Sequence, residues 1–282
     1  MKQAAVLIEA LPYIKKFRGQ RMVIKIGGSV LDSDLLVQTM MQNIVLLTYI
    51  GVEVVIVHGG GKHISTLLKR MGKESSFVAG LRVTDDETME ITQMVLAGWL
   101  NKNLTALIEQ EGGKAVGISG KDASLLVAKR LQVNHVNYGR VGKVAQVNSK
   151  LLETLLRDGF IPVVSPIASD GAGGSLNVNA DTVAYEIAAA IHARKLIVIT
   201  DVKGIYKDVN DETSLLTTIR VSELADLMDR SVITGGMLPK LESANRLIKN
   251  THLEALHLIS GKIPHALLLE LFTQKGIGTK LY

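Results

Sequence analysis

Two glycine-rich turns, Lys25-Ile26-Gly27-Gly28 and His58-Gly59-Gly60-Gly61, each follow a short apolar run. Glycines let backbone N–H groups approach a ligand closely, and a helix N-terminus behind such a turn favours phosphate oxygens. Lys25 stands among Val and Ile residues, where an ammonium group is costly to bury unless it meets an anion. It could also reach solvent from a strand end. Together the two turns predict a cradle for the phosphates of ATP at one edge of a sheet.

Neither turn matches a common nucleotide-binding motif. The chain contains no G-x-x-x-x-G-K-[ST] loop, no G-x-G-x-x-G dinucleotide fingerprint and no protein-kinase catalytic set. A phosphotransferase with this sequence must therefore use another scaffold.

Three later segments carry further polar groups. Asn177-Val178-Asn179-Ala180-Asp181 precedes a helical pattern, and it holds more amide and carboxylate groups than a helix N-cap needs, although Asn179 or Asp181 could be that cap. The segment 200–206 follows an apolar run, as a ligand-binding loop at a strand end does. The segment 234–240 places Lys240 in the first turns of a helix, either as a solvated lysine or, given the glycines before it, directed at phosphate.

The elements around these segments alternate between two patterns. Short β-branched runs predict buried strands at 22–26, 52–57, 114–118, 160–164, 195–199 and 254–259. Helical patterns occur at 2–17, 35–49, 62–71, 86–110, 148–158, 180–193, 222–230, 238–250 and 264–272. This alternation predicts an α/β fold, a three-layer αβα sandwich with a largely parallel central sheet. Pro12 predicts a kink or an early break in the first helix. The segment 162–176, rich in Pro and Gly, predicts a hinge that divides the chain into 1–175 and 176–282.

The composition excludes several classes of function. Apolar residues make up 47% and charged residues 21% of the 282, as in ordinary globular proteins. The net charge is +5, but the Lys and Arg residues are scattered and aromatics are only 4%, so we expect no nucleic-acid partner. The absence of Cys excludes disulfides and thiolate metal sites. No apolar run has membrane-spanning length, and the N-terminus is a poor secretory signal, so we expect no membrane association and a cytoplasmic location.

Together these segments resemble the amino acid kinase superfamily, and within it the acetylglutamate kinase branch, from about Met22 to Thr279. The most selective likenesses are the HGGG turn, Gly80-Leu81-Arg82-Val83-Thr84-Asp85, NVNAD, TDVKGIY and TGGM-L-P-K. One departure is Lys62-His63, where the family usually has proline after the triple glycine. We expect it to alter the stiffness or charge of the loop and to leave activity in place.

The resemblance implies ATP-dependent phosphorylation of the γ-carboxylate of N-acetyl-L-glutamate in arginine biosynthesis, with Mg²⁺ carried by the nucleotide and no protein-bound metal. It implies that the catalytic residues are Lys25, Lys240 and Asp181. The substrate-binding residues are Gly60, Gly61, Arg82, Asn177 and Asn179. The nucleotide-binding residues are Gly27, Gly28, Asp201, Lys203, Gly204, Tyr206, Thr234 and Gly236. Residues 19–175 would then form the acceptor part and residues 176–282 the nucleotide part with a C-terminal effector region.

Elementary chemistry is consistent with these roles. A carboxylate acceptor with a pKa of about 4.3 is already ionised at neutral pH, so the transfer needs no general base. It does need screening of the repulsion between two anions, which lysines, glycine N–H groups and Mg²⁺ supply. The fork of Arg82 suits a second carboxylate because it binds two oxygens at once.

The two ends of the chain resemble the arginine-inhibited subgroup of this family. The likeness implies that residues 1–18 form a helix that interlaces dimers into a hexamer, a trimer of dimers. It also implies an L-arginine site lined by Tyr13, Lys195, His265, Glu270 and Gly278. His265 could instead be a packing residue, and Glu270 could lie on a solvated helix face. A nitrogen-signalling protein is a conceivable further partner.

Two alternatives remain open on the sequence. The acceptor could be a related carboxylate such as N-acetyl-aminoadipate, which depends on the depth of the pocket around Arg82 and Asn177. The chain could also be a non-catalytic arginine sensor. The presence of Lys25, Asp181 and Lys240 together argues against a sensor, because a sensor has no use for paired phosphate-binding lysines.

Overall fold

An eight-stranded sheet forms the centre of the molecule. The computed structural model describes residues 2–133, 136–208, 210–229 and 238–282. The strand order is β14-β16-β15-β11-β1-β2-β8-β5. The strands are β1 (Arg21–Ile26), β2 (Glu53–His58), β5 (Ala115–Ser119), β8 (Ile161–Ser165), β11 (Lys195–Thr200), β14 (Thr218–Ile219), β15 (Ala255–Ser260) and β16 (Thr279–Leu281). The six strands from β15 to β5 run parallel, and β16 pairs antiparallel with β15. The predicted, largely parallel sheet is confirmed.

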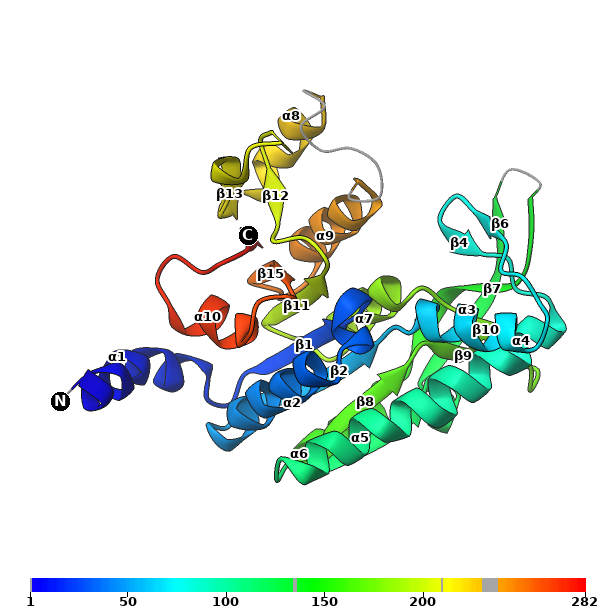
Figure 1. The fold of residues 1–282 in the computed structure, drawn as a ribbon, viewed down its shortest axis with the longest axis horizontal. Helices are drawn as coiled ribbons and strands as arrows, with labels where there is room; N and C mark the ends of the chain where they lie inside the picture. The colour runs from blue at the N-terminus through cyan, green and yellow to red at the C-terminus, as the bar shows by residue number, and fades with distance from the viewer. Residues whose placement is uncertain (1, 134–135, 209, 230–237) are drawn as a thin grey trace.

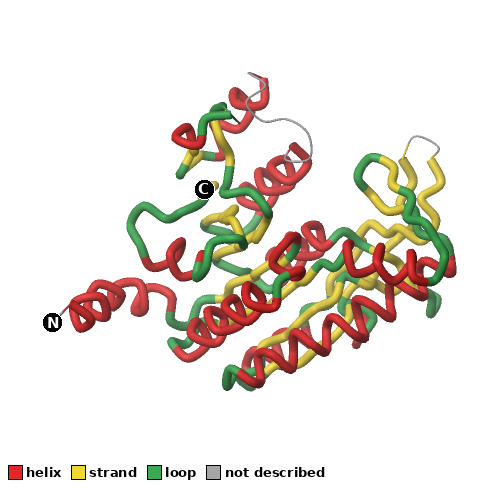
Figure 2. Tube along the Cα trace, in the orientation of Figure 1, coloured by secondary structure: helices red, strands yellow, loops and turns green. Residues whose placement is uncertain are grey.

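Helices cover both faces of this sheet, as Figures 1 and 2 show. Successive strand residues alternate between two hydrophobic cores, so that Ile24 joins one core and Val23 the other. The first core includes side chains of α2 (Asp34–Tyr49), α3 (Gly61–Arg70), α4 (Asp86–Gln93), α5 (Asn101–Gln110) and α10 (Ala266–Phe272). The second includes side chains of α6 (Lys150–Arg157), α7 (Ala180–Ala190), α8 (Leu224–Asp229) and α9 (Leu238–Asn250). These layers confirm the three-layer αβα sandwich.

The long helix predicted at 86–110 contains a different kind of turn. Between α4 and α5 lies a π-helical segment, η2 (Met94–Leu100). Such segments often occur at functional sites. Leu96 and Leu100 of η2 are buried in the first core.

A four-stranded barrel next to the sheet was not predicted. It closes in the order β10-β7-β6-β9, from β6 (Leu126–Val133), β7 (Val136–Val147), β9 (Ile167–Ser169) and β10 (Ser175–Asn177). The predicted boundary at residue 175 falls at the start of β10, which stays paired with β7 and β9. The central sheet contains strands from both sides of that boundary, since β1 pairs with β2 and with β11.

The N-terminal helix α1 (Lys2–Phe17) extends away from the sandwich (Figure 1). It is continuous through Pro12, so the break that we considered there is absent. Its last turns are fixed by aromatic contacts, because Tyr13 and Phe17 both lie against Phe272 of α10. Within the described residues, no helix is both long and apolar enough to cross a membrane.

Candidate active site

The two glycine turns lie side by side at the carboxyl end of the parallel strands. Ile26 is in register with His58, and the Gly59 N–H donates to the Ile26 carbonyl at 2.8 Å. A short 3₁₀ helix, η1 (Gly28–Asp32), follows the first turn, and α3 follows the second. The backbones of both turns therefore border the same space, as expected for adjacent parallel strands.

Lys25 and Asp181 form a nearly buried ion pair beside these turns. Lys25 lies between Val57 of β2 and Val198 of β11, and Asp181 lies in the first turn of α7. The Lys25 Nζ is 2.9 Å from the Asp181 Oδ1, and the two side chains are 11% and 12% exposed. The ammonium also lies against Gly27, where a Cβ atom would collide with it. The charge of Lys25 is thus held at the phosphate-type turn and does not reach solvent freely.

One cleft of about 250 Å³ collects most of the predicted acceptor and phosphate residues. Its lining includes Lys25, Gly27, Gly28, Gly60, Gly61, Arg82, Asn177 and Asn179. These come from β1, the α3 N-terminus, a β-hairpin, β10 and the start of α7. Residues that are far apart in sequence therefore share a single space.

Gly60 has a specific steric reason to be glycine. A Cβ atom there would lie 2.6 Å from a methyl carbon of Leu96 and 2.8 Å from one of Leu100. The π-helical segment η2 is therefore packed directly onto the second glycine turn. Leu96 of this π-helical segment also lines the cleft.

Arg82 is buried in the wall of the cleft on β4 (Leu81–Arg82), which pairs with β3 (Phe77–Val78). Its NH2 group donates to the Gly61 carbonyl at 2.7 Å and to the Ser65 Oγ at 2.9 Å, and NH1 donates to the Ser75 Oγ. The Phe77 ring lies 4.7 Å from the guanidinium carbon. Burial lowers the pKa of Arg82 below its usual value. Of the five N–H donors of a guanidinium, three are used by partners within the described part of the chain, which leaves two for a ligand there.

The two asparagines of the segment 177–181 make different contacts. Asn179 caps α7, because its Oδ1 accepts from the backbone N–H groups of Asp181 and Thr182 at 2.9 and 3.2 Å. Asn177 donates from Nδ2 to the Thr84 Oγ1 at 3.2 Å. The cap interpretation thus holds for Asn179, which also lines the cleft. Asp181 is left to pair with Lys25.

His58 has a structural role that the sequence reasoning missed. It is fully buried, its Nδ1 lies 3.0 Å from the Gly59 carbonyl, and its Nε2 lies 3.1 Å from the Asn101 Nδ2. Asn101 also donates to the Val163 carbonyl at 2.8 Å. Burial lowers the pKa of His58 to about 4, against a smaller opposing effect of the Gly59 carbonyl. Neutral His58 therefore joins the glycine turn to the sheet through Asn101. In the sequence, the one indication of such a role is that a polar residue ends the apolar strand β2.

Gly27 and Gly28 line the cleft described above, whereas the other described nucleotide residues, Asp201, Lys203, Gly204 and Tyr206, do not. The Asp201 carboxylate packs on the Cα of Gly28, so the loop after β11 touches the first glycine turn. Lys203 is paired with Glu212 at 2.7 Å, which raises the pKa of Lys203. Gly204 packs against Thr279, and Tyr206 lies in β12 (Ile205–Tyr206).

The last predicted glycine turn lies largely beyond the described part of the chain. Thr234 and Gly236 fall outside the described residues. The backbone of Lys240 is in the first turn of α9, and its side chain also lies outside the description. Helix α9 packs beside α7, the helix that carries Asp181.

Three of the five predicted effector residues, Lys195, Glu270 and Gly278, are connected through His257, which the sequence reasoning missed, and Tyr13 lies near them beside Phe17. The Lys195 Nζ is 3.1 Å from the His257 Nε2, and the His257 Nδ1 is 2.7 Å from the Glu270 Oε1. The Glu270 Oε2 accepts from the N–H of Gly278 at 3.0 Å. The Lys195 ammonium lies 5.6 Å from the ring of Phe17, which neighbours Tyr13.

The charges in this group are strongly affected by burial. Burial, with the nearby Lys280 and Lys16, lowers the pKa of Lys195 to about 8. Burial also lowers the pKa of His257. For Glu270, burial raises the pKa, but hydrogen bonds from His257 and from the Ile277 and Gly278 N–H groups outweigh it, and the pKa falls below its usual value. Glu270 is 7% exposed, so the alternative of a solvated helix face is wrong.

His265 stands apart from these residues. It precedes α10 with a left-handed φ of 56°, and its Nδ1 lies 2.8 Å from the Oδ1 of Asn43 in α2. This contact fits the packing alternative.

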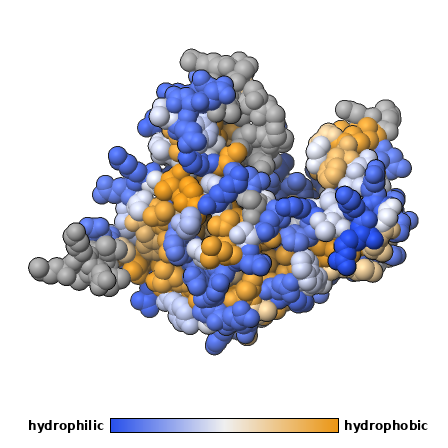
Figure 3. Space-filling model, viewed as in Figure 1, coloured by the Kyte–Doolittle hydropathy of each residue, from blue (hydrophilic) through white to orange (hydrophobic). Residues whose placement is uncertain are grey.

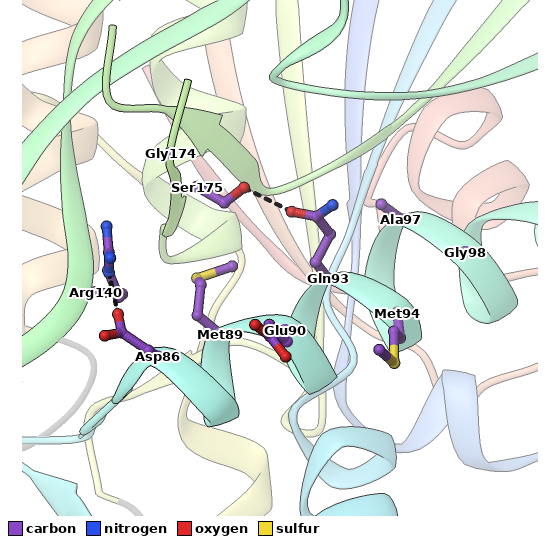
Figure 4. A pocket seen from close by; sticks show the side chains of 10 residues that line it. All are labelled: Asp86, Met89, Glu90, Gln93, Met94, Ala97, Gly98, Arg140, Gly174 and Ser175. Carbon is purple, nitrogen blue, oxygen red and sulfur yellow. Dashed lines mark hydrogen bonds and ion pairs between the residues drawn. The ribbon is translucent and has the colours of Figure 1, made fainter. Parts of the chain in front are cut away.

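A larger hollow of about 770 Å³ is lined by residues of α4 and η2 together with Arg140, Gly174 and Ser175 (Figure 4). Arg140 pairs there with Asp86, and the Ser175 Oγ donates to the Gln93 Oε1 at 2.6 Å. It contains neither glycine turn nor Lys25. We therefore place the candidate site in the smaller cleft. Over the described ranges, no group of three or more His, Asp or Glu side chains could hold a metal ion.

Comparison with known proteins extends these observations. The sequence profile of the amino acid kinase family matches residues 20–256. An acetylglutamate kinase of Methanothrix thermoacetophila is 49% identical, over 100% of this chain and 99% of that enzyme. One of Carboxydothermus hydrogenoformans is 48% identical, over 100% and 98%. Among solved structures, an N-acetylglutamate synthase from Neisseria gonorrhoeae, complexed with coenzyme A and N-acetyl-glutamate, has a TM-score of 0.87 at 25% identity. The match covers 99% of this chain but only 63% of the synthase.

Proposed function

The chain belongs to the amino acid kinase family, and we propose that it transfers the γ-phosphoryl group of ATP to the γ-carboxylate of N-acetyl-L-glutamate. The product is N-acetyl-L-glutamyl 5-phosphate, an intermediate of arginine biosynthesis. The observation that carries this proposal is the Lys25–Asp181 pair at 2.9 Å, held beside two glycine turns in the cleft that contains Arg82. A cation fixed next to backbone N–H groups suits a reaction between two anions.

The roles of the site residues follow from charge and position. An oxygen of the acceptor carboxylate attacks the γ-phosphorus, and the bond to the oxygen bridging the β- and γ-phosphates breaks, releasing ADP. Lys25 and Lys240 screen the repulsion between the anions and stabilise the transferring phosphoryl group. Asp181 holds Lys25 in place, and we assign it the same role for Lys240.

Acceptor recognition is assigned to residues 19–175 together with Asn177. The buried Arg82 keeps two N–H donors available, and a ligand carboxylate is their natural partner. Gly60 and Gly61 lie at the α3 N-terminus, where N–H groups favour an anion. Asn177 is proposed to bind the acetylamino group, with Asn179 beside it in the lining.

Nucleotide binding is assigned mainly to residues 176–282, with Gly27 and Gly28 supplying N–H groups to the phosphates. Gly28 fits this role sterically, because a Cβ atom there would collide with Asp201 and because its φ is +61°. Asp201, Lys203, Gly204, Tyr206, Thr234 and Gly236 are proposed to surround the adenosine. Mg²⁺ enters as the ion carried by the phosphates, where it would neutralise part of their charge.

A coupled ADP-release assay tests the activity and its acceptor. We expect turnover with N-acetylglutamate and much less with glutamate, aspartate or N-acetyl-aminoadipate. Preference for N-acetyl-aminoadipate would favour the alternative kinase. No turnover of any acceptor, with arginine still bound, would favour the non-catalytic sensor.

Inhibition by L-arginine forms a second part of the proposal. Its support is the buried Lys195–His257–Glu270 chain next to α1, which offers a cation and a carboxylate to an amino acid that carries both charges. His257 joins the proposed effector residues on this ground. Titration of the rate with arginine, with and without residues 1–18, tests it. An unchanged rate at millimolar arginine in the full chain would refute it.

Assembly into a hexamer, a trimer of dimers, is proposed through residues 1–18. In α1, Ile8 is 68% exposed and Leu11 41% exposed, and apolar residues reach the surface over much of the face in Figure 3. Exposed apolar side chains on a protruding helix favour contact with another protein surface. Light scattering with and without residues 1–18 tests this. We also propose that a nitrogen-signalling protein binds this enzyme and that the enzyme is located in the cytoplasm.

A further inference from the structure

Part of the wall of the cleft is built by a single segment of the chain. Residues 73–85, here called the acceptor flap, leave the end of α3, form the β3–β4 hairpin and return to the start of α4. Four residues of the flap line the cleft, Phe77, Gly80, Leu81 and Arg82. The position of the flap therefore determines where the guanidinium of Arg82 stands.

Lys73 joins the two ends of this flap. Its Nζ donates to both carboxylate oxygens of Asp85, at 2.8 and 2.7 Å, and to the Glu87 Oε2 at 2.7 Å. Asp85 is also the N-cap of α4, since its Oδ1 accepts from the Thr88 N–H at 2.8 Å. The first residue of the flap is thus fixed to its last residue and to the helix that follows.

The ionisation of these groups matches the contacts. Hydrogen bonds from Lys73 and Thr88 lower the pKa of Asp85 to about 2. Hydrogen bonds to Asp85 and Glu87 raise the pKa of Lys73. Lys73 and Asp85 are therefore charged at neutral pH, and the one ammonium group contacts two carboxylates.

We propose that Lys73 is a positioning residue that holds the acceptor flap closed and so places Arg82 against the acceptor. The inference rests on the proposed role of Arg82 in acceptor binding. Lys73 does not line the cleft and touches no reacting group, so its effect passes through the flap.

Other contacts also restrain the flap. Arg82 donates to the Gly61 carbonyl and to the Ser65 Oγ of α3, and Asn177 donates to the Thr84 Oγ1. The backbone itself supplies few restraints. The hairpin consists of two strands of two residues each, with one further backbone bond from the Val83 N–H to the Ser76 carbonyl at 2.9 Å. The returning end is fixed to β7 by the Thr84 N–H, which donates to the Tyr138 carbonyl at 3.1 Å. On the departing side, the Lys73 N–H donates to the Leu68 carbonyl at 2.9 Å. Loss of the Lys73 side chain removes the side-chain link between these two anchored ends, and we expect the flap to open more often.

Steady-state kinetics with N-acetylglutamate and ATP test the inference. We expect Lys73→Met to raise the KM for the acceptor about five- to tenfold, because the variant loses two partly exposed ion pairs that hold the flap. The kcat and the KM for ATP should stay within about twofold of wild type. Lys73→Arg should restore most of the affinity. Lys69→Met is the matched control, because Lys69 is an exposed lysine on α3 and its loss removes the same charge.

Hydrogen exchange on the ligand-free protein gives a readout that does not depend on turnover. Residues 74–84 should exchange faster in Lys73→Met and not in Lys69→Met. If Lys73→Met fails to fold, Glu87→Gln removes the negative charge of one of the two partners of Lys73 and leaves the α4 cap intact. It should give a smaller change in the same direction.

The outcomes separate this inference from the proposed function. Failure of the wild-type chain to phosphorylate N-acetylglutamate would refute the proposed function, while the exchange data still test the flap. An unchanged acceptor KM in Lys73→Met, or equal rises for acceptor and ATP, would overturn the inference while the kinase activity stands.

Discussion

The ammonium of Lys25 lies 2.9 Å from the carboxylate of Asp181, where the end of a central strand meets the start of helix α7. Both side chains are nearly buried, and the pair neighbours both glycine turns. A charge in such a position is held without reorganisation, which makes it effective against charge that develops during phosphoryl transfer.

Replacement of Lys25 tests this arrangement most directly. We expect Lys25→Met to lower kcat by roughly 10²- to 10³-fold, as loss of one preorganised electrostatic donor does, with smaller changes in both KM values. The variant also removes the nearly buried ion pair between Lys25 and Asp181, so we expect a lower thermal unfolding midpoint. Steady-state kinetics and a thermal melt of the same preparation measure the two effects. A kcat within about threefold of wild type would contradict the catalytic role.

Lys240 should behave like Lys25 in its effect on the rate. Its backbone lies in the first turn of α9, which packs beside α7, the helix that carries Asp181. We expect Lys240→Ala to lower kcat by a similar roughly 10²- to 10³-fold factor. Normal turnover by Lys240→Ala would refute the two-lysine mechanism.

Arg82 should act on the acceptor and not on the nucleotide. We expect Arg82→Met to raise the KM for N-acetylglutamate roughly 10- to 100-fold, the range for charged hydrogen bonds, and to leave the KM for ATP nearly unchanged. Arg82→Lys should not rescue it, because an ammonium cannot reproduce the contacts to Gly61, Ser65 and Ser75 together with a ligand.

An acceptor analogue without the α-carboxylate supplies the second half of that test. The wild-type enzyme should discriminate strongly against N-acetyl-4-aminobutyrate, whereas Arg82→Met should treat the two acceptors almost alike. Equal discrimination by both proteins would assign the α-carboxylate to another residue.

Gly60→Ala tests the packing of η2 on the second glycine turn. The added methyl group would lie within 2.8 Å of side-chain carbons of Leu96 and Leu100, so we expect a loss of about 1–3 kcal/mol in unfolding free energy together with reduced activity. Leu96→Ala in the same chain should restore part of the activity by making room. Gly98→Ala, where no atom lies within 4 Å, is the control and should be neutral or stabilising.

His58 should make the protein less stable in mild acid. Its pKa is about 4 in the folded state and 6.5 unfolded, so the unfolded chain binds more protons between these values. Its contribution is therefore complete above pH 6.5 and is lost as the pH falls toward 4, by about 3 kcal/mol in total.

Denaturant unfolding at pH 7 and pH 4.5 measures that contribution. The wild-type free energy of unfolding should fall more steeply with pH than that of His58→Gln, which has no group titrating in this range at that position. Identical slopes for the two proteins would show that His58 is not responsible.

The sequence predicted the sandwich well because its signals are local. Each of the six predicted strands lies within one residue of an observed one, since a β-branched run buried on both faces is visible in five or six residues. The barrel was missed for the opposite reason. Strands β6 and β7 mix polar and apolar residues, and they are closed into a barrel only by β9 and β10 from a later part of the chain.

The sequence by itself determined the two glycine turns, the lysine beside the first of them and the order of strands and helices, because each depends on residues close together in the chain. Only the tertiary structure decided which side chains meet. It paired Lys25 with Asp181 and set His257 between Lys195 and Glu270. The partners in these contacts are far apart in the sequence, or one of them lies in an apolar strand. Strand register and helix packing therefore determine the contacts, and no local sequence pattern could predict them.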